Sequence, residues 1–198
     1  GKPIMNKLMR GNLEITKTSE DKKVEGISFK VSGTTEIGTT FEEIYKTDKD
    51  GKISIKNLLV GTYEVSEVVD DLTVGYITPE SQTVTIKHDE TAEIKMENKL
   101  IHGGFNLLKT DEDKKPLAGV KFGLYKADGT PLVEFITGKD GTYSMTDLLY
   151  GDYYLKELET VKGFEFDKEA VYAFSVSKDG EIIEITAVNK KIPETPVI

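Results

Sequence analysis

The sequence contains no cysteine and no tryptophan among its 198 residues, and it has only two histidines, His88 and His102. The absence of cysteine excludes disulfides, thiol nucleophiles and thiolate metal sites. Two histidines so far apart in the sequence argue against a zinc site and against a serine-type catalytic triad. We therefore expect neither a metal nor a cofactor.

Positive charge is also scarce, because 26 basic residues face 35 acidic ones and the net charge is −9. A nucleic-acid surface needs a basic stripe, so nucleic acid is not an expected partner. No apolar run approaches the length of a membrane helix, and no signal-peptide pattern follows Gly1. We expect this stretch of chain to be soluble, without membrane insertion, and any export signal or anchor to lie outside it.

What the sequence does contain is an internal repeat. Asp50-Gly51 and the run 58–61 recur 90 positions later as Asp140-Gly141 and the run 148–151. These matches predict two domains, at about 11–99 and 103–191. Residues 1–10 are interpreted as a linker or as the end of an upstream repeat, because the run 6–8 resembles the run 98–100. Residues 192–198, with two prolines, are interpreted as an exit linker.

Both copies have the pattern of an all-β fold. Short runs rich in Val, Ile, Thr, Tyr and Phe alternate with polar residues, and Asp-Gly turn signals separate them. The expected strands are 12–18, 26–32, 41–46, 52–56, 62–69, 82–87 and 92–98, then 104–110, 119–126, 132–136, 142–146, 152–158, 170–177 and 181–189. Seven short strands in some 90 residues predict a two-sheet sandwich in each copy.

Three polar residues in each copy fall on the apolar face of a strand. Side chains alternate between the two faces, so Lys17 shares the inward face with Leu13 and Ile15. The same argument turns a glutamate and an asparagine inward, and the second copy repeats all three. The six residues are Lys17, Glu67 and Asn98 in copy one and Lys109, Glu157 and Asn189 in copy two. An inward lysine at a strand end usually reaches back to water, and such an asparagine is often a turn residue. Recurrence in two copies favours a shared role.

Burial favours the neutral forms of lysine and glutamate. A neutral lysine amine is a nucleophile, and a protonated glutamate can polarise the amide carbonyl of asparagine. The three side chains can therefore react with one another. The lysine would attack the asparagine, the glutamate would shuttle protons, and ammonia would leave. The product would be an uncharged Lys–Asn isopeptide bond.

At these residues the sequence resembles the collagen-adhesin B-type (Cna-B-like) domains of Gram-positive surface adhesins and pilins. The resemblance covers nearly all of both copies, including Lys17-Thr18 and Lys109-Thr110, Leu58-Leu59 and Leu148-Leu149, and the terminal asparagines. It implies a transthyretin-like, reverse-immunoglobulin sandwich with a spontaneous bond between the first and last strands. By this match Lys17 and Lys109 are the nucleophiles. Glu67 and Glu157 are the catalytic carboxyls, and Asn98 and Asn189 are the acceptors.

Some features depart from the family pattern or leave alternatives open. Glu159 lies two residues after Glu157 and is therefore expected on the same face of the strand, so either could be the carboxyl of copy two. Residues 192–196 superficially resemble a sortase signal but are interpreted as linker. The run 48–51 is interpreted as a hairpin turn rather than a calcium loop. The charged runs 20–23 and 111–115 are interpreted as solvated turns.

The leading functional hypothesis is structural. The two copies would be stalk repeats of a cell-wall-anchored bacterial surface protein, located outside the cell, and one self-crosslinking turnover would not make the chain an enzyme. The expected partners are neighbouring repeats, with host extracellular matrix bound only through a tip domain elsewhere in the protein. The alternatives are an adhesin module that itself binds a matrix protein or glycan, and an accessory domain of a secreted hydrolase.

Overall fold

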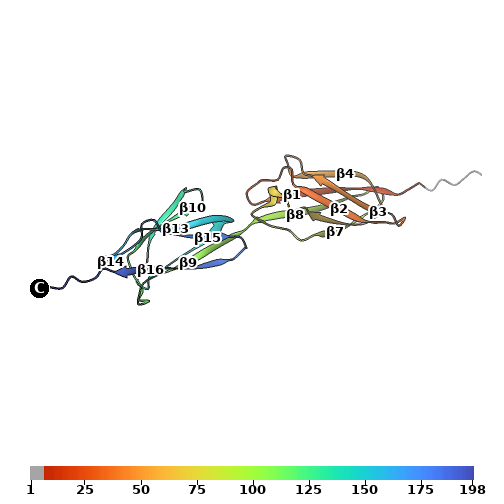
Figure 1. Cartoon of the computed structure of the whole chain (residues 1–198). Coiled ribbons are helices and arrows are strands. Elements are labelled where there is room, and N and C mark those ends of the chain that lie inside the picture. The colour runs from red at the N-terminus through yellow and green to blue at the C-terminus, as the bar shows by residue number, and fades with distance from the viewer. Residues whose placement is uncertain (1–6) are drawn as a thin grey trace, which may run out of the picture. The chain divides into compact units, whose positions relative to one another are not determined.

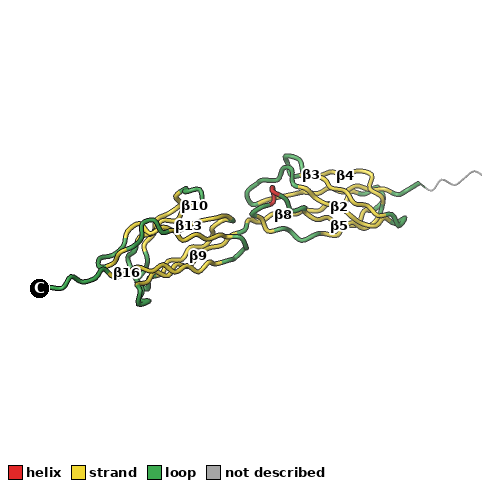
Figure 2. The backbone as a smooth tube through the Cα atoms, in the orientation of Figure 1, coloured by secondary structure: helices red, strands yellow, loops and turns green. Residues whose placement is uncertain are grey.

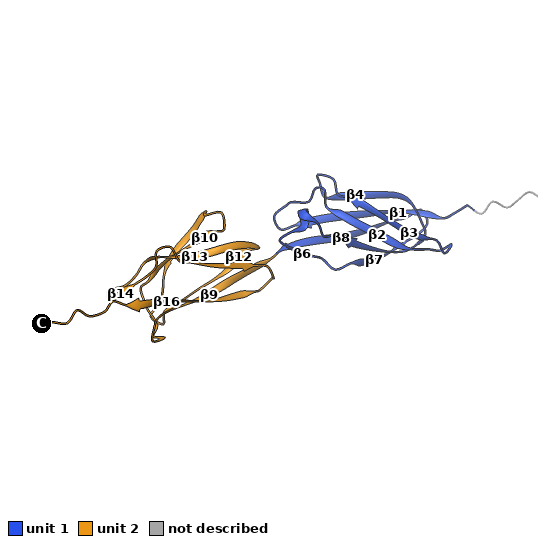
Figure 3. Ribbon diagram, in the orientation of Figure 1, with its two compact units in different colours: residues 1–100 blue, residues 101–198 orange. Residues whose placement is uncertain are grey.

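A computed structural model describes residues 7–198 of the chain and divides it into two compact units. Unit 1 extends to Leu100 and unit 2 runs from Ile101 to Ile198 (Figure 3). The interpretation of the N-terminal residues as the end of an upstream repeat rests on the run 6–8, so part of it lies outside the described residues.

Unit 1 is a sandwich of two four-stranded sheets. Its strands are β1 (Arg10–Ser19), β2 (Ser28–Thr35), β3 (Thr40–Lys46), β4 (Lys52–Leu59), β5 (Gly61–Glu67), β6 (Tyr76–Ile77), β7 (Gln82–Ile86) and β8 (Thr91–Leu100). One sheet has the order β4-β1-β8-β6 and the other β3-β2-β5-β7 (Figure 1). The first and last long strands, β1 and β8, are parallel neighbours, whereas the other pairs in this unit are antiparallel.

Unit 2 repeats this topology. Its strands are β9 (His102–Asp111), β10 (Lys121–Lys126), β11 (Pro131–Ile136), β12 (Thr142–Leu149), β13 (Gly151–Glu159), β14 (Phe164–Glu165), β15 (Val171–Val176) and β16 (Ile182–Lys191). The sheets have the orders β12-β9-β16-β14 and β11-β10-β13-β15, and β9 and β16 are again parallel. The expected all-β sandwich fold is confirmed.

The sequence did not predict the two-residue strands β6 and β14, or the short 3-10 helix η1 (Asp71–Thr73), drawn in red in Figure 2. Strands β6 and β14 are too short to show alternation and exist because they pair with the ends of β8 and β16. Helix η1 is held by a capping box, in which the Asp70 carboxylate accepts from the Leu72 amide and the Thr73 hydroxyl accepts from the Asp70 amide.

Each unit has its own apolar core between its two sheets, made by the inward residues of the alternating strands. In unit 1 the most deeply buried members include Leu13, Ile15, Phe29, Val31 and Val65. In unit 2 they include Phe105, Leu107, Phe122, Leu124 and Leu155. Each core is continuous with the polar residues described next, because these follow the core residues at two-residue steps along the same strands.

Candidate functional site

All six polar side chains that the sequence turns inward are buried, so their predicted orientation is confirmed. They are Lys17, Glu67 and Asn98 in unit 1 and Lys109, Glu157 and Asn189 in unit 2. In each unit the lysine comes from the first strand, the asparagine from the parallel last strand, and the glutamate from the facing sheet.

In unit 1, the carboxylate of Glu67 bridges the other two side chains. Its Oε2 lies 3.0 Å from Lys17 Nζ, and both side chains are completely shielded from solvent. Its Oε1 accepts a hydrogen bond of 3.0 Å from Asn98 Nδ2. The structure therefore brings the three predicted residues of unit 1 into one contact cluster.

The polar atoms of this cluster are incompletely satisfied. Lys17 Nζ, Glu67 Oε2 and Asn98 Oδ1 are buried without a hydrogen-bond partner among the described residues. The first two lie 3.0 Å apart, within ion-pair distance of each other. A buried polar group left unpaired costs about 1–3 kcal/mol, so the lone Oδ1 of Asn98 beside a buried ion pair needs an explanation.

The backbone of each lysine is fixed by the hairpin turn before the fourth strand. The amide of Lys17 donates to the Gly51 carbonyl at 2.7 Å, and that of Lys109 donates to the Gly141 carbonyl at 2.8 Å. Gly51 and Gly141 have φ values of 75° and 74°, and a side chain on either would collide with the lysine carbonyl oxygen. Each Asp-Gly turn therefore fixes the backbone position of the lysine in its own unit.

Unit 2 holds the same residues in a different arrangement. Lys109 Nζ donates to the backbone carbonyls of Thr110 at 3.1 Å and Ala187 at 3.2 Å. Asn189 Nδ2 donates to Glu157 Oε1 at 2.7 Å and also to Thr160 Oγ1 at 2.9 Å. A neutral amine has two N–H groups, so these two carbonyls can occupy both and leave the nitrogen lone pair free.

Burial shifts the pKa values of Lys17, Lys109 and Glu157 toward the neutral forms. Desolvation lowers the pKa of Lys17 against the opposing influence of the Glu67 carboxylate, which lies 3.0 Å from Nζ. Desolvation likewise lowers the pKa of Lys109, against the charges of Glu157 and Asp111. It raises the pKa of Glu157, although hydrogen bonding to Asn189 and the charge of Lys109 act in the other direction. An unprotonated lysine beside a protonated glutamate is the pair that aminolysis of an amide requires.

Glu159 does not share the buried environment of Glu157, so the parity argument was wrong for this residue. Phe122 lies opposite Glu157 but Lys121 lies opposite Glu159, which leaves Leu158 as an extra residue in a β-bulge. The bulge breaks the alternation and turns Glu159 to the surface, where its side chain is 73% exposed and 3.9 Å from Lys121 Nζ.

The prediction of solvated turns is also wrong for Asp111. Its carboxylate is buried because the following turn folds back over it, and Oδ1 accepts from the amides of Asp113 and Lys115. In the run 48–51, the Asp48 carboxylate accepts from the amides of Asp50 and Lys52, as in a hairpin turn.

Two further interactions border the sites and were not found from the sequence. In unit 1, Tyr76 donates a hydrogen bond of 2.6 Å to Asp21, and burial together with this bond raises the pKa of Tyr76 to about 12. In unit 2, Thr160 contacts Asn189 directly. Thr160 lies just past the end of β13, where strand parity no longer assigns a side chain to a face.

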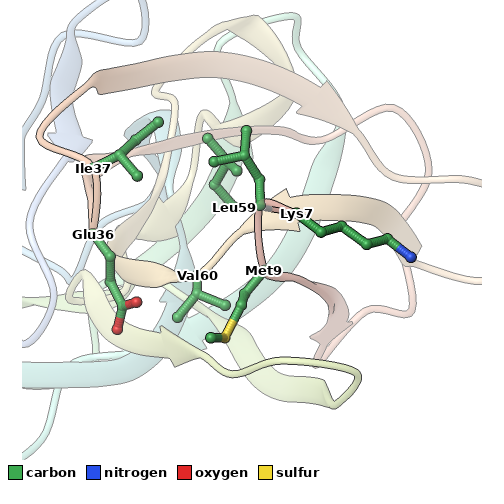
Figure 4. A pocket seen from close by; sticks show the side chains of 7 residues that line it. Lys7, Met9, Glu36, Ile37, Leu59 and Val60 are labelled. Carbon is green, nitrogen blue, oxygen red and sulfur yellow. The ribbon is translucent and has the colours of Figure 1, made fainter. Parts of the chain in front are cut away.

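A surface hollow of unit 1 lies apart from the buried triad. It has a volume of about 400 Å³ and is lined by Lys7, Leu8, Met9, Glu36, Ile37, Leu59 and Val60. Figure 4 shows the apolar side chains of Met9, Ile37, Leu59 and Val60 around it.

Within residues 7–198, no group of three or more His, Asp or Glu side chains is arranged to hold a metal ion. The described helical residues form no segment capable of crossing a bilayer.

Comparison with known proteins identifies relatives of both units. Residues 11–100 and 103–191 match the SpaA family, described as a prealbumin-like fold domain. The collagen adhesin of Staphylococcus aureus is 39% identical over 83 residues, which cover 38% of this chain and 7% of the adhesin. The Bacillus anthracis TIE protein superposes with a TM-score of 0.74 at 29% identity, covering 93% of this chain and 34% of that one. A C-terminal fragment of the pilus adhesin SpaC from Lactobacillus rhamnosus GG shares the fold, with a TM-score of 0.59, 12% identity and coverage of 95% and 100%.

Proposed function

This chain belongs to the family of SpaA prealbumin-like fold domains, and from that premise we propose that its two units are self-locking stalk modules of a bacterial surface protein. Each unit would form one intramolecular isopeptide bond, between Lys17 and Asn98 in unit 1 and between Lys109 and Asn189 in unit 2. The resemblance to Cna-B-like domains is confirmed by the relatives, which are Gram-positive adhesins and pilins.

The observation that carries the proposal is the burial of a lysine, a glutamate and an asparagine at equivalent strand positions in both units, with all three in contact in unit 1. Burying an ionised lysine beside a carboxylate is costly, and replacing such a pair by apolar residues is often neutral or stabilising. A cluster retained twice in two small cores therefore indicates a chemical role. In unit 1, bond formation would consume the buried amine of Lys17, which faces Glu67 at 3.0 Å, and leave an uncharged amide in its place.

The reaction needs no group beyond these side chains. The neutral lysine amine attacks Cγ of the asparagine, a C–N bond forms, and the carbonyl electron pair moves to Oδ1. The glutamate delivers a proton to Nδ2 and recovers one from the attacking nitrogen. The Cγ–Nδ2 bond then breaks, the carbonyl re-forms and ammonia leaves. Each site reacts once, so the chain is not an enzyme in this proposal.

The setting of the protein follows from its relatives. The chain spans 7% of the collagen adhesin and about a third of the TIE protein, so the remaining parts of those proteins have no counterpart here. We infer a location on the outer surface of the cell, with anchoring to the cell wall and any binding of host matrix supplied by other segments. The neighbouring repeats of the same chain are the partners of each unit.

Intact-mass measurement tests the proposal directly. The full chain should be lighter than its sequence mass by two molecules of ammonia. Lys17→Ala or Asn98→Ala should restore one, and Lys109→Ala or Asn189→Ala the other. Lys56→Ala is the matched control, because Lys56 is 58% exposed on β4 and should leave both losses intact. A wild-type mass equal to the sequence mass would refute the proposal.

A further inference from the structure

The two sites differ at the leaving nitrogen of the asparagine. In unit 1, Asn98 Nδ2 donates to Glu67 alone among the described residues. In unit 2, Asn189 Nδ2 lies between Glu157 Oε1 at 2.7 Å and Thr160 Oγ1 at 2.9 Å. The residue at the position of Thr160 in unit 1 is Asp70, whose carboxylate instead caps helix η1. The hydroxyl is therefore a feature of unit 2 only.

We propose that Thr160 is a second catalytic residue of unit 2, whose hydroxyl relays a proton from Glu157 to the departing nitrogen of Asn189. This inference rests on the proposed isopeptide chemistry and refines it. The hydroxyl is both a donor and an acceptor, so it can pass a proton on while receiving another. Thr160 Oγ1 and Glu157 Oε1 both lie within hydrogen-bond distance of Asn189 Nδ2, so the hydroxyl and the carboxyl meet at the leaving nitrogen.

The step balances as follows. Lys109 attacks Cγ of Asn189 as a neutral amine, and the carbonyl electron pair moves to Oδ1. Glu157 gives its proton to Thr160 Oγ1 while the original hydroxyl proton of Thr160 moves to Nδ2. The attacking nitrogen then returns a proton to Glu157. The Cγ–Nδ2 bond breaks, ammonia leaves, and Glu157 and Thr160 end in the states in which they began.

The lysine amine is held differently in the two units. Its amine is held by the backbone carbonyls of Thr110 and Ala187. In unit 1 the corresponding amine lies 3.0 Å from the glutamate. The glutamate contacts the leaving nitrogen in both units, but only in unit 2 does a hydroxyl contact that nitrogen as well.

The test uses the full chain, and the rate of bond formation in unit 1 serves as the internal reference. The protein is made by cell-free translation, samples are quenched in denaturing acid at intervals, and the two cross-linked peptides are quantified separately by mass spectrometry. Thr160→Val keeps the shape but removes the hydroxyl, and we expect it to slow the bond of unit 2 by on the order of 10- to 100-fold, within the range of acid–base catalysis. Thr160→Ser should stay within a few-fold of wild type, and the unit 1 rate should not change in either variant.

Folding is checked in an Asn189→Ala background, where neither chain can cross-link unit 2, so the melting temperatures with and without Thr160→Val compare packing alone. A normal unit 2 rate in Thr160→Val would overturn the inference, as would equal slowing by Val and Ser. A wild-type chain that never loses ammonia from unit 2 would instead refute the isopeptide proposal itself, and the relay with it.

Discussion

Asn98 stands two residues beyond Lys17 along the parallel strands β1 and β8, because Lys17 is paired with Met96 and Asn98 with Ser19. Two residues correspond to about 6.6 Å of strand, a distance that the extended side chain of a lysine can cover. The offset lets the amine approach the asparagine along the sheet surface. Glu67 reaches the same point from the facing sheet and contacts both residues.

The carboxyls are the first residues to test. Glu67→Gln and Glu157→Gln should each stop or slow, by about 100-fold or more, the bond of their own unit, because glutamine cannot exchange the proton. The measurement is the loss of ammonia from the intact chain. Glu159→Gln is the matched control for unit 2, since Glu159 lies at the surface beside Lys121. Normal cross-linking in Glu157→Gln would show that this carboxyl does not shuttle the proton.

Loss of a bond should lower stability strongly. Each bond closes a loop of about 80 residues, and the loop-entropy relation for a covalent cross-link gives roughly 4.5 kcal/mol per unit. That is a large fraction of the net stability of a small domain. Lys17→Met removes the bond without leaving a buried amine, and unit 1 of this variant should melt well below wild type in calorimetry. Equal melting temperatures, with the missing bond verified by mass, would contradict the prediction.

Bond formation should depend on pH with a maximum. In unit 2 burial lowers the pKa of Lys109 from its ordinary 10.5 and raises that of Glu157 from its ordinary 4.5. The rate should fall at acid pH, where Lys109 takes up a proton, and at alkaline pH, where Glu157 loses one. Time courses of cross-linking across a pH series would check this, and a rate that rises without limit toward high pH would argue against a protonated Glu157.

Mechanical load should bypass most of each unit. Once bonded, tension would pass from the first strand to the last through the cross-link, and residues 18–97 and 110–188 would carry no covalent load. Between the two bonds only the segment from Asn98 to Lys109 could be drawn out, at about 3.3–3.6 Å per residue. Single-molecule pulling should show no release of a whole unit, whereas Asn98→Ala should restore such a release for unit 1 alone.

Alternation along the long strands was sufficient to predict which side chains point inward, because the pleat of a strand enforces it locally. It therefore placed Lys17 beside the core residues Leu13 and Ile15, and the structure agrees. Parity also predicted that Glu157 and Glu159 would share a face. The bulge at Leu158 defeats that prediction, because it depends on the partner strand β10.

The surroundings of the sites could not be predicted for the same reason. Thr160 and the Tyr76–Asp21 hydrogen bond lie in a turn, in a very short strand or just past a strand end, where side-chain directions are set by contacts between distant parts of the chain. Asp111, in contrast, is the last residue of the long strand β9 and follows the inward alternation of Leu107 and Lys109. The repeat itself was the most useful signal. Equivalent residues in two copies made a buried triad recognisable where a single inward lysine would have an ordinary explanation.

The parallel pairing of first and last strands has a consequence for how such proteins change over generations. Because β1 and β8 are parallel, as are β9 and β16, the chain enters a unit at one end of the sandwich and leaves it at the other. Each triad is drawn wholly from its own unit. Recombination between repeats in the gene can therefore add or delete a whole unit without removing a reacting residue from the others. The length of the repeat array would then change in steps of one unit.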